Sequence, residues 1–92
     1  MGRSTAPVTI IMARLIERPI DVTTGRGGTP VAFRWNGRYL RVDVLDRWVE
    51  AGRWWEGEGE QISFRVATAA GGVYELAWRL ADRRWLLYKA YD

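Results

Sequence analysis

The fold prediction starts from residues 31–42, which read Val31-Ala32-Phe33-Arg34-Trp35-Asn36-Gly37-Arg38-Tyr39-Leu40-Arg41-Val42. The dipeptide Asn36-Gly37 stands between two alternating runs of apolar and polar residues, and this is the strongest short-range signal of a β-hairpin. Both central residues of a type I′ turn need a positive φ, which Asn and Gly tolerate best. A two-residue turn at this position sets the pairing of the two strands and therefore sorts their side chains by face.

The two faces of this predicted hairpin differ in chemistry. Because side chains alternate across a strand, one face carries five apolar residues, namely Val31, Phe33, Trp35, Leu40 and Val42. The opposite face carries Ala32, Arg34, Tyr39 and Arg41. We expect the apolar face to be buried and the basic face to lie in water.

Apolar runs on both sides of this hairpin extend the strand pattern. Residues 8–16 are mostly apolar and rich in β-branched side chains, which favours a buried strand. The alternation after Val42 fails at Val44-Leu45, so we expect a β-bulge near Leu45 or Asp46. A short helix over residues 44–51 is the alternative interpretation of that segment.

Residues 61–80 predict a second hairpin. A three-residue loop at residues 70–72 aligns the two apolar sets, and it pairs Phe64 with Trp78 and Ile62 with Leu80. A solvated charge cluster is expected on the other face, formed by Arg65, Glu75 and Arg79. A two-residue turn at Asp82-Arg83 then leads into a last strand that is apolar on both faces and so central or barrel-closing.

These elements predict an all-β protein with a single domain. We expect an antiparallel meander of six to seven short strands over residues 8–92, closed into a small barrel that is SH3-like in size. Residues 1–7 are expected to form a flexible lead-in. At 92 residues the chain can bury one core, and its six tryptophans can supply much of it.

The composition excludes several kinds of chemistry. The chain has no Cys and no His, so it lacks thiol nucleophiles, disulfides and imidazole acid–base groups. Glu56, Glu58 and Glu60 do not follow the ligand pattern of a calcium loop. We therefore expect a non-enzymatic protein without catalytic residues, metal or cofactor. The short apolar runs and the absence of Cys indicate a cytoplasmic protein that does not contact a membrane.

Two candidate binding surfaces follow from the residues. Trp54 and Trp55 are adjacent, so period-two geometry points them to opposite faces of a strand and leaves one outside the core. With Trp48, this pair is the candidate surface for a protein partner or for self-association into a homo-oligomer. The alternative is weak binding of single-stranded nucleic acid by Arg34, Tyr39 and Arg41, through stacking and phosphate contacts.

Several blocks of residues 28–92 resemble a known group of proteins. The blocks are Pro30 to Trp35 with Gly37, Val44-Leu45-x-x-Trp48, Gly52-x-Trp54-Trp55, Phe64-Arg65-Val66, Gly72 to Leu76 and Arg84-Trp85-x-Leu87-x-x-x-Tyr91-Asp92. This pattern resembles a family of small uncharacterised bacterial proteins, common in actinobacteria. It is also similar to the C-terminal region of ImuB-type Y-family DNA polymerase homologues. The resemblance implies an accessory or docking role in DNA damage tolerance, in the context of such a polymerase, and it supplies no catalytic residues.

Overall fold

The computed structural model describes residues 13–51 and 59–91, and in this part the chain is built almost entirely of antiparallel strands. The elements are β1 (Ala13–Pro19), β2 (Val22–Thr24), the 3-10 turn η1 (Arg26–Gly28), β3 (Pro30–Trp35), β4 (Arg38–Glu50), β5 (Gln61–Thr68), β6 (Val73–Arg79) and β7 (Arg84–Tyr91). The described residues contain no α-helix. The predicted all-β meander is therefore confirmed. Residues 8–12 of the first expected strand lie outside the described part, and the expectation that this strand is buried is wrong for the rest, because β1 lies at an edge of the sheet and Leu15 is 59% exposed.

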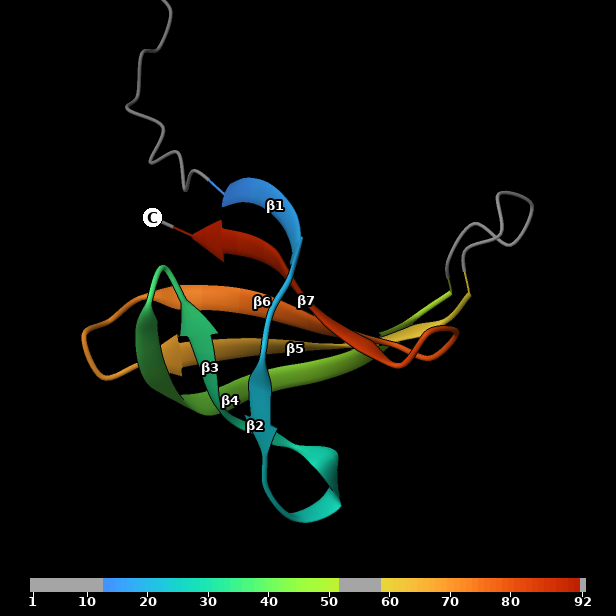
Figure 1. Ribbon diagram of the computed structural model, residues 1–92, viewed down its shortest axis with the longest axis horizontal. Helices are drawn as coiled ribbons and strands as arrows, with labels where there is room; N and C mark the ends of the chain where they lie inside the picture. Colours follow the sequence, from blue (N-terminus) through green and yellow to red (C-terminus); the bar gives the residue numbers. More distant parts are fainter. Residues whose placement is uncertain (1–12, 52–58, 92) are drawn as a thin grey trace, which may run out of the picture.

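The seven strands form one curled sheet in the order β1-β7-β6-β5-β4-β3-β2 (Figure 1). Two changes of partner produce the curl. The first residues of β4 pair with β3, whereas Val42 to Glu50 pair with β5. On the other side, the amide of Ile20 donates to the carbonyl of Trp85 in β7, and the carbonyl of Asp21 accepts from Arg34 in β3. The β1–β2 segment thus joins the two ends of the sheet, and the predicted barrel takes the form of a half-barrel.

The hairpin of β3 and β4 has the predicted register. Trp35 pairs with Arg38 and Phe33 pairs with Leu40, while Asn36 and Gly37 have φ values of 53° and 75°. The exception is Val31, which we expected on the buried face and which is 42% exposed. The register between β2 and β3 skips Val31, so this residue is bulged out of the pairing and packs near Gly25. Ala32 is buried instead.

Strand β4 continues to Glu50, so the alternative of a helix over residues 44–51 is wrong. The predicted bulge is confirmed, because the register between β4 and β5 shifts between Val44 and Asp46. Leu45, the residue passed over, is exposed. After this bulge the alternation of β4 is inverted, and Arg47 and Val49 lie on the inner face opposite Phe64 and Ile62.

Two predicted turns differ from the structure, the first in position and the second in length. The loop between β5 and β6 has three residues as expected, but it spans residues 69–71, with Gly71 at a φ of 95°. Phe64 therefore pairs with Leu76 and Ile62 with Trp78. The two-residue turn at Asp82-Arg83 is a four-residue turn over residues 80–83, because Arg79 pairs with Arg84.

The core lies on the inner face of the sheet. Five fully or almost fully buried side chains form its centre, namely Phe33, Phe64, Val66, Leu76 and Leu87. Phe33 meets Tyr74 edge to face, with 5.2 Å between ring centroids. Leu86 and Leu87 are both buried, as the apolar character of both faces of β7 predicts. Leu80, expected to face inward, is exposed because it belongs to the turn.

Candidate functional site

An apolar groove opens on the inner face of the sheet, at the end away from the hairpin of β3 and β4. Its walls come from β4 to β7 and from the η1 loop, and its volume is about 340 Å³. We call it the aromatic groove, and its lining residues are Thr24, Gly27, Gly28, Thr29, Arg47, Ile62, Phe64, Trp78 and Trp85. A continuous row of paired residues crosses its floor, because Ile62 pairs with Trp78 and Trp78 pairs with Trp85.

The side chains of this row are only partly covered. Trp78 and Trp85 are half-buried and pack against each other at 5.3 Å between centroids, and Trp85 also meets Phe64 at 5.6 Å. Val49 extends the row on β4 and is 56% exposed. Large apolar patches on a protein surface are typical of interaction sites, so this row is a candidate binding surface.

Arg47 supplies the charge at the rim of the aromatic groove. Its guanidinium lies over the ring of Phe64, 5.9 Å from the centroid, so the side chain is directed across the groove. It forms no ion pair with any carboxylate in the described ranges 13–51 and 59–91. Among the described lining residues, the groove therefore combines an aromatic floor with the cation of Arg47.

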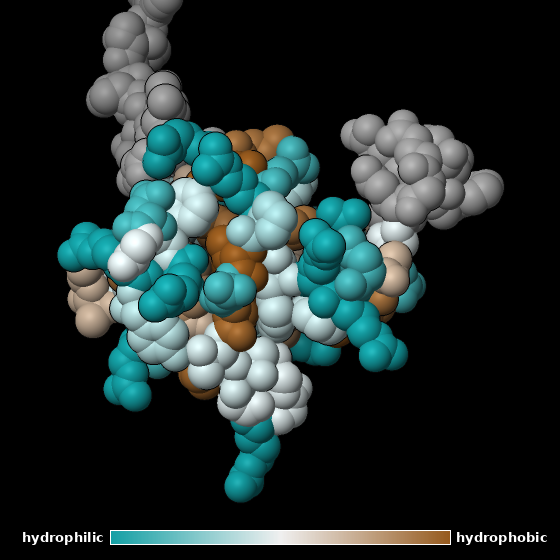
Figure 2. Space-filling model, viewed as in Figure 1, coloured by the Kyte–Doolittle hydropathy of each residue, from teal (hydrophilic) through white to brown (hydrophobic). Residues whose placement is uncertain are grey.

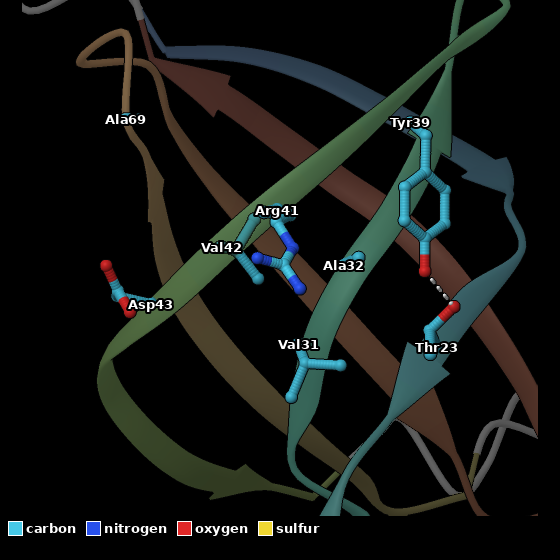
Figure 3. Close-up of a pocket in the computed structure, with 8 residues that line it drawn as sticks. All are labelled: Thr23, Val31, Ala32, Tyr39, Arg41, Val42, Asp43 and Ala69. Carbon is cyan, nitrogen blue, oxygen red and sulfur yellow. Dashed lines mark hydrogen bonds between the residues drawn. The ribbon is translucent and has the colours of Figure 1, made fainter.

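A second depression, of about 510 Å³, lies on the outer face of the β3–β4 hairpin (Figure 3). We call it the hairpin groove, and it is lined by Thr23, Val31, Ala32, Tyr39, Arg41, Val42, Asp43 and Ala69. Tyr39 points from β4 toward β2, where its hydroxyl and the Thr23 hydroxyl share a hydrogen bond of 2.7 Å. Arg41 extends toward Val31, with the buried Ala32 to one side.

The structure brings together the three residues predicted for nucleic-acid binding. Arg34 pairs directly with Tyr39, and Arg41 lies two residues along the same strand, so all three share the outer face. All three are exposed. Neither arginine forms an ion pair within the part of the chain that the structure describes.

Trp48 lies elsewhere, on the outer face of β4, where it pairs with Ser63. It is half-buried, and the guanidinium of Arg65 lies over its ring at 5.3 Å. Arg65 also lies 5.7 Å from the ring centroid of Tyr91. Trp54 and Trp55, the other two residues predicted for partner binding, lie outside the described residues. The surface proposed for these three tryptophans therefore stays a prediction.

The surroundings of Arg65 correct one expectation. Glu75 is buried rather than solvated. Its carboxylate accepts a hydrogen bond from Tyr91 and forms an ion pair with Arg65 at 3.5 Å. The hydrogen bond to Glu75, with burial and the charge of Glu75, raises the pKa of Tyr91 above its ordinary value. Hydrogen bonding to Tyr91 is the largest cause that raises the pKa of Arg65. The polar groups of Arg65, Glu75 and Tyr91 bind one another, so we assign this cluster to stability.

The alternating pattern places Ile62, Phe64 and Trp78 on the inner face, but it does not show that they line a groove. The only signal in the sequence is the surplus of tryptophan, six in 92 residues, which a small core does not need in full. Within the described ranges no group of three or more acidic residues is placed to hold a metal ion. No helix found there is long and apolar enough to cross a membrane.

Comparisons with known proteins give one match. A family model described as a domain of unknown function, DUF6504, matches residues 9–92. No curated protein and no solved structure matches the chain. The match covers nearly the whole chain, and its description assigns no function.

Proposed function

The chain belongs to the DUF6504 family, and from the geometry of its aromatic groove we propose that it is a non-enzymatic docking module for a partner protein. The observation that carries this proposal is the partly exposed row of Ile62, Trp78 and Trp85 on the inner face of the sheet. Tryptophan is among the residues enriched at the centre of protein interfaces, because it buries a large area with few rotatable bonds.

The proposed occupant is an extended segment of the partner with one large apolar side chain beside acidic residues. A groove of about 340 Å³ suits an anchoring side chain and its neighbours. Aromatic-lined grooves in small β domains bind extended segments in this way. The acidic neighbours follow from Arg47, whose planar guanidinium can pair with a carboxylate in two hydrogen bonds.

The biological setting is proposed from the sequence resemblance. Similarity to the C-terminal region of ImuB-type Y-family polymerase homologues supports a cytoplasmic accessory role in DNA damage tolerance, and the partner would belong to that system. Trp48, Trp54 and Trp55 are kept as a second partner surface in this proposal. The proposed occupant is a partner protein and not a second copy of this chain. The experiment below distinguishes the two.

A display library of random peptides tests the proposed docking function without knowledge of the partner. We expect selection on the whole protein to enrich peptides with a Leu, Ile, Phe or Trp flanked by Asp or Glu. Arg47→Glu, a change at an exposed rim position, should lower the affinity for these peptides about tenfold or more, because charge reversal replaces an attraction by a repulsion. Binding is measured by fluorescence anisotropy.

Arg38→Glu is the matched control for this experiment. Arg38 is an exposed arginine at the far end of β4, outside the aromatic groove, so its reversal changes the net charge equally and should leave peptide affinity nearly unchanged. Val49→Lys should weaken binding as Arg47→Glu does. Equal losses for Arg38→Glu and Arg47→Glu, or enrichment of basic peptides, would contradict the proposal. A concentration-dependent dimer that Val49→Lys dissociates would show that a second copy occupies the groove.

A further inference from the structure

The second groove carries an inference that is independent of the docking proposal. We propose that the hairpin groove binds single-stranded nucleic acid, with one base stacked on Tyr39 and the adjoining phosphates bound by Arg34 and Arg41. This site lies on the outer face of the sheet, whereas the aromatic groove lies on the inner face. The two proposals can therefore fail separately.

Tyr39 has the exposure and the rigidity that a stacking platform needs. The residue is 55% exposed, so a large part of its ring is open to a ligand. The hydrogen bond between its hydroxyl and that of Thr23 ties the end of the ring to β2 and limits its rotation (Figure 3). A base that stacks on a ring already held in place loses little further conformational freedom, and base–aromatic stacking tolerates any base.

Both arginines neighbour Tyr39 on the outer face of the hairpin; Arg41 lines the groove, and Arg34 lies next to it without lining it. Arg34 is the direct cross-strand neighbour of Tyr39, and Arg41 is displaced by about 7 Å along β4 on the same face. A single strand that stacks one base on Tyr39 would place the phosphates before and after that base near the two guanidinium groups. Because neither arginine has a carboxylate partner in the described part of the chain, no internal ion pair has to break first.

The groove also favours a single strand over the other anionic polymers. A duplex keeps its bases stacked on one another and cannot offer a face to Tyr39, so it would contact only the arginines. An acidic peptide would satisfy the arginines but would leave the tyrosine ring without a planar partner. Asp43, at the edge of the groove, repels any polyanion and should reduce the affinity in the natural protein.

The experiment titrates a labelled oligothymidine strand and a labelled oligouridine strand onto the whole protein, followed by fluorescence anisotropy at salt concentrations from about 50 to about 200 mM. We expect the logarithm of the affinity to fall against the logarithm of salt, with a slope near −1.4 for two neutralised phosphates. Arg41→Ala should lower the affinity and make the slope shallower by about 0.7. Tyr39→Leu should lower the affinity about five- to 150-fold, whereas Tyr39→Phe should retain most of it.

Two further variants decide whether the groove itself is responsible. Arg38→Ala is the matched control, since Arg38 pairs with Trp35 and so lies on the other face of the same hairpin. It should affect binding far less than Arg41→Ala. Asp43→Asn removes a repulsion and should tighten binding, an increase that a misfolded variant could not show. All of these positions are exposed, and thermal melting checks that each variant folds.

Several results would overturn the proposal. Equal losses for Arg38→Ala and Arg41→Ala would reduce the effect to net charge. Equal affinity for a duplex, for heparin or for polyglutamate, with no dependence on Tyr39, would show a site for polyanions in general. No change of anisotropy with either single strand at the lowest salt would remove the site altogether.

Discussion

At the scale of single residues, the structure separates two aromatic side chains that the sequence pattern treats alike. Phe64 and Trp78 both belong to the apolar sets of the second hairpin, and the alternation turns both inward. Both side chains line the aromatic groove, but Phe64 is buried in the central cluster, whereas Trp78 is half-buried. The first residue therefore serves mainly stability, and the second is available for binding.

Truncation should reveal this difference. Phe64→Ala removes a buried ring from the core and should lower the free energy of unfolding by about 3–5 kcal/mol. Trp78→Ala should cost less, because part of its indole is already in water in the folded protein. Urea denaturation measures both variants, with Leu45→Ala as an exposed control that should change stability by less than about 0.5 kcal/mol. A smaller loss for Phe64→Ala than for Trp78→Ala would contradict the assignment of the groove.

Tyr91 gives a prediction about pH. Its folded pKa is raised because the neutral hydroxyl donates a hydrogen bond to buried Glu75. A raised pKa means that this stabilisation is fully present below the ordinary tyrosine pKa of about 10 and is lost as the pH rises through the folded value. Tyr91→Phe should be less stable than the natural protein at neutral pH, and the difference in Tm should narrow above about pH 10. A difference in Tm between the two proteins that stays constant from pH 7 to above about pH 10 would contradict this prediction.

At the scale of elements, the turns show what a sequence can predict. Asn36-Gly37 was predictable because both residues favour positive φ and no neighbour competes for the turn. The loop after β5 has two adjacent glycines, and the structure uses Gly71 rather than Gly72 at the positive φ, which moves the pairing by two residues. Because the shift is even, every paired side chain keeps its predicted face, and Phe64, Val66 and Leu76 stay in the core.

Gly71 tests this account of the loop. An alanine at φ 95° would be strained whatever the space around it, and nothing lies within 4 Å of the position that its Cβ would take. We expect Gly71→Ala to lower the free energy of unfolding by about 1–2 kcal/mol through the backbone alone. The control is Ala69→Ser in the same exposed loop, which should change stability little. Chemical denaturation distinguishes the two, and equal small effects would place the required glycine elsewhere.

Other local features were not predictable from the residues. Nothing in the Leu80–Arg83 segment signals a four-residue turn, because Arg83 adopts a φ of 54° without being glycine or asparagine. The bulge at Val31 depends on the partner strand β2, whose register is set by the tertiary fold. Local preferences therefore located the strands and the first turn, whereas long-range pairing decided the remaining registers.

At the scale of the whole molecule, the half-barrel keeps its two grooves on opposite faces of one sheet. Figure 2 shows hydrophobic side chains in a narrow band over the middle of the visible face, bordered by hydrophilic side chains on both sides. The residues predicted for nucleic-acid binding were found from local pairing, because Arg34, Tyr39 and Arg41 belong to one hairpin. The aromatic groove was not found, because alternation marks an inner face without showing whether another element covers it.

The order of strands also has a consequence for the route by which the chain folds. Along the sheet from β7 to β2, every pair of neighbours is consecutive in the sequence, so each contact closes only a short loop. The single exception is β1 on β7, where Ala13 pairs with Tyr91 across almost the entire described chain. Contacts that close short loops form early, and those that close a long loop wait until its entropy cost has been reduced by the structure already present. The meander should therefore assemble hairpin by hairpin, and the docking of β1 on β7 should be the late event that joins the two ends of the sheet.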